Sequence, residues 1–588
     1  MNRRNFVKTA TLVPLMAGRA PLSIAFPGAL NPTENIVADA SMTPIRDRFE
    51  LTLKRAMQGD LPSYTEEFLL ADVRPTPERR FTEYSGDLSG RYIGALATAA
   101  QVYGMQFPSL DALVAKVIAV QKPEGYFGIG FHFDTPTDND MALLWGNGRL
   151  LVGLLEYYRL RPSAQVLAAC TRLGDFLVRI GPMMLSKEMR ESFGAQHFAS
   201  SYICWMQQTE GLANLYVVTK DERYRKLAEG IAAVIERRAS DHVHGYLTSV
   251  RGVMDLYQAT GDTRFLRQCE AAWQDVADSK DLLITGGVPE GWSPNGHRTE
   301  GCAEADWVRL NLALWKATSD AKYLSMAERA TFNELAFNQY ATGDFGHRVY
   351  TETGLPAAGA VRAWWCCTLH GLRCFPDVQT SAFRSKDGGL RYELPIDGWI
   401  ETSALSAVAE SSLARDGRVR IKITKAGDGP SSLRIRVPEW SEGSAIRLNG
   451  SLANFPAEGG YVGIARAWSA GDVIEVKYAM RLRSAPAGEN RIAYSFGPWL
   501  LGAPAAENLA YFNEMTIENK LVRGKEEARL PSEHTPRRFS VPVAATTCQY
   551  VAAEFPDQAA TVELRAIAEQ TGQPTTSWEL RFLTEEPG

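Results

Sequence analysis

The hydrophobic pattern of this 588-residue chain changes its period near residue 385, and this change constrains the fold more than any other feature. Before it, apolar residues recur on one helix face, as in the segment from Gly148 to Leu160. After it, apolar and charged residues alternate, as from Val419 to Ile423 and from Ile474 to Tyr478. The sequence therefore predicts a multidomain α + β protein, with a helical domain followed by antiparallel β-sandwich domains.

A short pattern occurs three times in the helical half, beginning at Tyr216, Tyr257 and Trp315. Each copy has an aromatic residue, then Thr, then Asp, and ends with a basic and an aromatic residue. This order predicts the end of one helix, a tight loop with an Asp cap, and the start of the next helix. Stacked helical hairpins form a closed toroid or an open solenoid. The unequal spacing of the copies favours a closed (α/α)6 barrel, which would bind ligand at one end, and the solenoid remains the alternative.

The first 40 residues resemble a twin-arginine (Tat) export signal. Arg3 and Arg4 precede Phe6 and a short apolar run, and residues 38–40 offer an A-x-A cleavage motif. The run is too short for a permanent membrane anchor, so we expect a periplasmic or secreted protein. The four predicted segments are the signal peptide at 1–40, the (α/α) barrel at 41–385, a β-sandwich at 386–505 and a second β module at 506–588.

Charge and cysteine content exclude two classes of protein. The net charge of −5 gives no sign of a basic surface for nucleic acid. Eight cysteines in 588 residues are too few for a disulfide scaffold. Two of them, Cys366 and Cys367, are adjacent, which draws attention to the chemistry around them.

Two short segments carry the candidate chemistry. The first, from Thr299 to Trp307, contains Glu300 and Cys302, and the second contains Cys366 and Cys367. Three thiolates and a carboxylate could supply the four ligands of a zinc ion. The spacing is not that of a zinc finger, however, so inert buried cysteines and a strained vicinal disulfide both remain open.

The order of these elements resembles glycoside hydrolase family 127, the β-L-arabinofuranosidase-like family of zinc-dependent retaining enzymes. That family carries a Glu-x-Cys and a Cys-Cys, with a polar residue and Arg just downstream. Further likeness lies at 281–288, with its Thr-Gly-Gly, at 327–333, and at 434–440 in the β region. The resemblance covers roughly residues 80–505 and implies an (α/α) barrel followed by a β-sandwich.

The resemblance also implies roles for individual residues. Glu300, Cys302, Cys366 and Cys367 would bind Zn²⁺, and Cys366 would also be the nucleophile. A glutamate between the Thr-Gly-Gly segment and Glu300 would be the general acid/base, and Glu290 is the one in that stretch. The chemistry would be the two-step retaining scheme, with sulfur in place of a carboxylate nucleophile.

Departures from the family pattern concentrate in the expected sugar pocket. His370 stands where many members have Asn, and Arg149 follows Gly148 where a family His contacts the sugar. We expect His244, His370, Arg149 and Trp365 to face a glycoside or oligosaccharide substrate in a divergent subgroup. A homodimer is left open. The alternatives are an (α/α)-toroid glycosidase or lyase with a structural zinc site, or a non-catalytic carbohydrate-binding protein.

Overall fold

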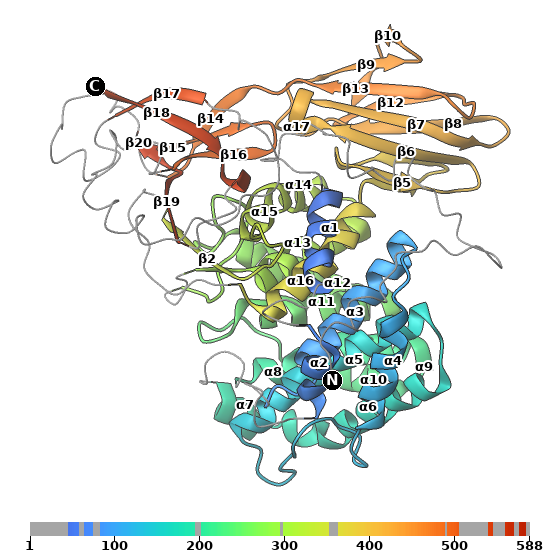
Figure 1. Ribbon diagram of the computed structural model, residues 1–588, viewed down its shortest axis with the longest axis vertical. Helices are drawn as coiled ribbons and strands as arrows, with labels where there is room; N and C mark the ends of the chain where they lie inside the picture. Colours follow the sequence, from blue (N-terminus) through green and yellow to red (C-terminus); the bar gives the residue numbers. More distant parts are fainter. Residues whose placement is uncertain are drawn as a thin grey trace, which may run out of the picture.

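The computed structural model shows a helical domain that carries two β-rich regions (Figure 1). The helices, blue to yellow, lie at one end of the molecule, and the orange and red strands lie at the other. The described residues are 45–57, 64–74, 83–194, 201–293, 298–351, 363–488, 491–504, 539–544, 559–569 and 575–583. The predicted signal peptide and much of 506–588 lie outside them. Among the described helices, none combines the length and apolar character needed to span a bilayer.

The helical domain is built around a closed ring of six inner helices. Each packs against the next along the chain, and the last of them, α16, packs against the first, α3. This closure distinguishes a barrel from an open solenoid, so the predicted (α/α)6 barrel is confirmed. The inner helices are α3 (Asp87–Tyr103), α5 (Asp138–Leu160), α9 (Gln208–Thr219), α11 (Val243–Thr260), α13 (Gly301–Thr318) and α16 (Trp365–Gln379).

A second layer of helices covers the outside of the ring. Each presents an apolar stripe inward; in α12 this stripe includes Phe265, Cys269 and Trp273, four residues apart. The outer helices are α1 (Ile45–Met57), α4 (Pro108–Ala119), α6 (Ala164–Met184), α10 (Glu222–Ala232), α12 (Thr263–Ala277) and α14 (Ala321–Ala330). Short helices complete the domain: α2 (Glu66–Val73), α7 (Lys187–Gly194), α8 (Ile203–Met206), η4 (Thr331–Leu335) and α15 (Ala336–Asn338).

The repeated sequence pattern forms the turns from three inner helices to the outer helices that follow them. In the second copy, the Thr260 hydroxyl donates to the Leu256 carbonyl at 2.6 Å. The Asp262 side chain then accepts from the Arg264 backbone N–H at 2.9 Å. The same bonds recur in the other two copies. The residue before each aspartate has a positive φ: Lys220 (59°), Gly261 (73°) and Ser319 (63°). The pattern thus ends one helix and caps the next, as predicted.

Residues 383–478 form two mainly antiparallel sheets whose apolar residues share one core. In β7, Val419, Ile421 and Ile423 are buried and the residues between them are exposed, as the alternating pattern predicts. One sheet has the order β10-β9-β13-β7-β6-β5 and the other β11-β12-β8-β4-β3. The strands are β3 (Phe383–Lys386), β4 (Gly389–Tyr392), β5 (Gly398–Ile400), β6 (Leu405–Ser412), β7 (Arg418–Ala426), β8 (Pro430–Arg436), β9 (Ser444–Leu448), β10 (Ser451–Ala453), β11 (Ala457–Glu458), β12 (Tyr461–Ala467) and β13 (Val473–Tyr478).

The strands after residue 481 form a separate sheet that reaches the helical domain. Its strand β19 pairs in parallel with β2, and β2 pairs with β1, which ends at Glu300. The sheet contains β1 (Thr299–Glu300), β2 (His347–Thr351), β14 (Leu482–Pro486), β15 (Arg491–Phe496), β16 (Trp499–Pro504), β17 (Phe539–Ala544), β18 (Ala559–Ala566), β19 (Thr575–Glu579) and β20 (Phe582–Leu583). The pairing groups β14–β16 with the strands beyond 505, and the predicted domain boundaries themselves stay predictions.

Candidate active site at the N-terminal ends of the inner helices

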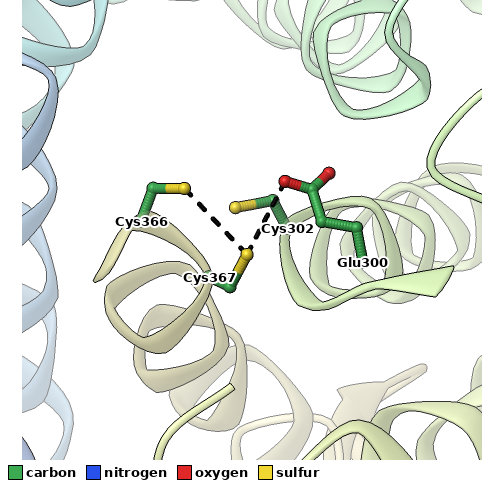
Figure 2. Close-up of side chains that lie close together, drawn as sticks. All are labelled: Glu300, Cys302, Cys366 and Cys367. Atoms are coloured by element: carbon green, nitrogen blue, oxygen red, sulfur yellow. Dashed lines mark hydrogen bonds between the residues drawn. The ribbon is translucent and has the colours of Figure 1, made fainter. Parts of the chain in front are cut away.

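Two inner helices bring the four predicted ligand residues together (Figure 2). Glu300 is the N-cap residue of α13 and Cys302 lies in its first turn, while Cys366 and Cys367 lie in the first turn of α16. Figure 2 shows the four side chains converging on one space between these helix ends. The first turn of a helix carries unpaired N–H groups and a partial positive charge, so this position stabilises thiolates and carboxylates.

Gly301 lets the two helices approach this closely. A Cβ atom at this position would lie 2.8 Å from the Cβ of Phe345 and 3.2 Å from the Cβ of Cys367. Carbon atoms in a packed interior do not come as near as 2.8 Å, so any larger residue would displace Phe345 and would also crowd α16 at Cys367. The glycine between Glu300 and Cys302 is therefore a requirement of the site's geometry.

The four potential ligand atoms lie within 4.8 Å of one another. The Sγ atoms of Cys366 and Cys367 are 4.0 Å apart, and Cys367 Sγ lies 3.6 Å from Glu300 Oε1. At this separation the adjacent cysteines are free thiols, which removes the vicinal-disulfide alternative in this structure. Three of the four residues are buried, and Cys366 is only partly so.

This geometry suits a tetrahedral metal ion. Two sulfurs bound at about 2.3 Å in a tetrahedron lie about 3.8 Å apart, close to the separation of Cys366 and Cys367. Hydrogen bonds from Cys302 and Cys367 hold the pKa of Cys366 well below its ordinary value. Burial instead raises the pKa values of Cys302 and Cys367. The most exposed of the three thiols is thus also the one most readily held as a thiolate.

A histidine that the sequence analysis missed holds Glu300 from the other side. His242 Nε2 lies 2.8 Å from Glu300 Oε2. Burial lowers the pKa of His242, but the Glu300 carboxylate more than offsets this and the net shift is upward. His242 stands two residues before the predicted His244, so the Asp-His-Val-His segment offered a signal for both.

Glu290 lies beside this cluster, with a carboxylate oxygen within 4.8 Å of ligand atoms of both His242 and Glu300. Arg298 donates from Nη2 to Glu290 Oε1 at 2.9 Å and from Nε to Oε2. His347 Nε2 is 3.5 Å from the same Oε1. The carboxylate predicted as general acid/base is therefore fixed in orientation beside Glu300 and His242.

A second group of polar residues adjoins the thiol cluster through Arg91, which contacts Cys302. Asp306 Oδ2 accepts from His244 Nδ1 at 2.6 Å, and Asp306 Oδ1 accepts from His370 Nε2 at 2.9 Å. Arg91, another residue that the sequence analysis missed, reaches the far nitrogens of both imidazoles. These three residues and Asp306 are buried and already hydrogen-bonded to one another, so they form a network and not a second cation site.

The predicted substrate residue Arg149 lies deeper in the ring. Its Nη1 donates to Glu210 Oε2 at 3.1 Å, and Arg251 and Arg373 also contact Glu210. Burial raises the pKa of Glu210, yet these three arginines hold it below its ordinary value. The structure thus places Arg149 in a buried charge cluster, apart from the four thiol and carboxylate ligands.

Comparison with known proteins decides the family. The profile described as "Beta-L-arabinofuranosidase, GH127 catalytic domain" matches residues 76–380, more than half of the chain. The profile described as "Beta-L-arabinofuranosidase, GH127 middle domain" matches residues 397–480. The chain belongs to glycoside hydrolase family 127. It is therefore a glycoside hydrolase, as its resemblance implied.

Solved GH127 structures share this fold over nearly the whole chain. A GH127 β-L-arabinofuranosidase from Geobacillus stearothermophilus T6 superposes with a TM-score of 0.67 at 17% identity, covering 92% of this chain and 99% of its own. A second GH127 β-arabinofuranosidase gives a TM-score of 0.66 at 18% identity, covering 93% and 94%. No curated protein matches the sequence. At such identities the likeness shows the fold, and individual residue roles must be argued from this chain.

Trp365, the remaining predicted substrate residue of this GH127 chain, begins α16 beside the thiol cluster. It is half-buried, with its ring 5.1 Å from the Trp364 ring and 5.5 Å from the Phe68 ring, measured between centroids. Trp364 in turn lies 6.0 Å from the His347 ring. An aromatic wall of this kind beside the cluster suits the apolar face of a sugar. The substrate roles of Trp365, His244, His370 and Arg149 stay predictions.

Proposed function

We propose that this protein is a zinc-dependent retaining β-L-arabinofuranosidase that uses Cys366 as its nucleophile. The observation that carries the proposal is the convergence of three thiols and Glu300, with Cys366 the most exposed of them. The named activity of the GH127 relatives supplies the sugar class, a furanosidic residue.

The donor set fits zinc better than other common metals. Thiolates select zinc over magnesium or calcium, and one carboxylate completes four ligands. Glu300, Cys302, Cys366 and Cys367 would hold the ion. When bound, zinc would keep the thiols ionised at neutral pH, where a free cysteine is mostly protonated.

The residues around the cluster divide the work of a two-step reaction. In the first step Cys366 Sγ attacks the anomeric carbon, the bond to the leaving oxygen breaks, and Glu290 gives that oxygen a proton. In the second step Glu290 takes a proton from water, which attacks the same carbon and releases Cys366 Sγ. Two inversions at one carbon retain its configuration. His242 positions Glu300, and Arg298 positions Glu290.

The test is Cys366→Ser measured against Cys170→Ser. Cys170 serves as the control because it also lies in the barrel but is fully buried on the outer helix α6. We expect Cys366→Ser to lose about 10³-fold or more of kcat while substrate still binds, because the hydroxyl is a far weaker nucleophile. Cys170→Ser should keep wild-type kcat. Near-normal rates in Cys366→Ser would exclude the nucleophile and favour a purely structural zinc site.

The metal and the sugar need their own measurements. Elemental analysis of the purified protein should give one zinc per chain, and none would contradict the metal proposal. A panel of aryl glycosides should show fastest release from β-L-arabinofuranoside. Faster release from another glycoside would support a hydrolase with a different sugar specificity. This outcome has to be tested because Arg149 and His370 depart from the family pattern.

We also propose export through the Tat route, on the strength of Arg3 and Arg4. The route carries folded proteins, so free thiols could be enclosed, and a metal loaded, before the chain meets an oxidising compartment. Fractionation should find the protein outside the cytoplasm, and replacement of both arginines by lysine should retain it inside. Equal export of the two forms would exclude this route.

A further inference from the structure

Arg91 connects the thiol cluster to the polar network below it. It lies in the second turn of α3, and its side chain is 3% exposed. Its Nη1 donates to Cys302 Sγ at 3.7 Å and to His370 Nδ1 at 3.2 Å, and its Nη2 donates to His244 Nε2 at 2.9 Å. Every nitrogen of the guanidinium has a partner, since Nε donates to Asp87 Oδ1 at 2.8 Å.

The bond directions fix the two imidazoles as neutral spacers. A guanidinium only donates, so the histidine nitrogens that face Arg91 must accept. The opposite nitrogen of each ring then carries its proton and donates to Asp306. His244 and His370 therefore lie between the Arg91 guanidinium and the Asp306 carboxylate. The two imidazole rings fix the distance between these charged groups.

Asp87 holds the guanidinium from the remaining side. Trp145 Nε1 donates to Asp87 Oδ1 at 3.1 Å, so this carboxylate is itself anchored to the neighbouring helix α5. Residues of four inner helices, α3, α5, α11 and α16, thus fix one arginine that also donates to a thiol on a fifth helix, α13. A side chain with so many bonds cannot relocate without breaking several of them.

We propose that Arg91 is a positioning residue for the thiol centre: it fixes Cys302 Sγ toward Cys366 and Cys367 and supplies a permanent positive charge beside them. The inference rests on the proposed thiolate function and extends it to a residue outside the ligand set. Three thiolates and a carboxylate repel one another, and a fixed guanidinium offsets part of that repulsion. A lysine would keep the charge and lose the fork that holds both imidazoles.

The first experiment compares Arg91→Lys with wild type, using cobalt(II) in place of zinc. We expect Arg91→Lys to change the thiolate-to-cobalt absorption bands, because the Cys302 sulfur shifts. We also expect kcat to fall about 10- to 100-fold, the usual cost of losing a residue that supports metal ligands, with KM changed less. Arg436→Lys is the matched control, since Arg436 is a buried arginine that pairs with Glu328 away from the site. It should leave both readouts unchanged.

The second experiment needs no metal. Urea midpoints are measured for metal-free Arg91→Met, Cys302→Ala and the double variant, and for the same cycle with Cys170→Ala. Shifts should be non-additive for Arg91 with Cys302, which are in contact, and additive for Arg91 with Cys170. Additive shifts in the first pair, or a kcat of Arg91→Lys within twofold of wild type, overturn the proposal. If Cys366→Ser keeps its rate, the nucleophile fails while this cycle remains readable.

Discussion

The interior of the β-sandwich and the interior of the helical ring are filled by opposite kinds of residue. Between the two sheets lie apolar side chains such as Ile421, Leu433 and Ile474, all fully buried. Along the ring axis lie Asp306 and Glu210, no more than 1% exposed and surrounded by arginines and histidines. The first interior gains free energy by removing apolar surface from water, whereas buried ion pairs roughly break even.

The contrast shows that the interior of the helical ring is built for the site and contributes less to stability than the sandwich core does. Charges arranged in layers below the thiol cluster contribute little net free energy of folding, yet they fix the orientation of groups that face the site. Removing one partner leaves another charge buried and unpaired, so these layers are rigid once formed. The sandwich core does not orient any group of the site. Its residues can therefore be replaced by other apolar residues of similar volume.

The largest effect should separate activity from stability at the edge of the ring. Glu290→Gln keeps the size of the side chain and removes its acid/base function. We expect kcat to fall about 10²- to 10⁴-fold with the urea midpoint nearly unchanged. A loss smaller than tenfold would argue for another acid. Steady-state kinetics with an aryl glycoside, alongside unfolding curves, measure both quantities.

A change one layer down should affect activity and stability together. Asp306→Asn removes the anion that pairs with Arg251 and accepts hydrogen bonds from His244 and His370. We expect the free energy of unfolding to fall by about 3–5 kcal/mol, because the buried Arg251 guanidinium loses a charged partner. Chemical denaturation measures this loss, and kinetics on the folded fraction should show lower kcat. Unchanged kcat would mean that the layer serves folding alone.

A change in the sandwich should affect stability only. Ile421→Ala deletes a fully buried side chain of β7 and should cost about 2–5 kcal/mol of unfolding free energy. The milder Ile421→Val should cost about 0.5–1.5 kcal/mol. Both should keep wild-type kcat per folded molecule. A lower kcat in either variant would show that the sandwich transmits its packing to the site, and would break the contrast between the two interiors.

The smallest effect should come from a repeat turn outside both interiors. Asp262→Ala removes the cap of α12 and should cost about 0.5–2 kcal/mol of unfolding free energy. Asp262→Asn keeps an acceptor oxygen and should restore most of that loss. Equal stabilities of the alanine and asparagine variants would show that the hydrogen bond to Arg264 does not stabilise the turn.

The sequence was most informative where a structure depends on neighbours along the chain. The three turn motifs and the strand alternation are local, and each is found in the predicted element. The pairs Glu300–Cys302 and Cys366–Cys367 are local too, and each lies at the start of an inner helix. Arg91 and His347 were missed because neither stands near a motif, and their meaning comes from distant partners. Cys302, for example, lies 211 residues from Arg91.

By itself the sequence determined the two periods, the helical hairpins and the residue types of the thiol cluster, because propensity, capping and side-chain chemistry act over a few residues. Only the tertiary structure decided that the ring closes and that α13 and α16 meet at Gly301. It also decided that Arg149 lies deep in the ring with Glu210 while Arg91 contacts Cys302. Those outcomes depend on how six helices pack around one axis, and no short stretch of sequence contains that information.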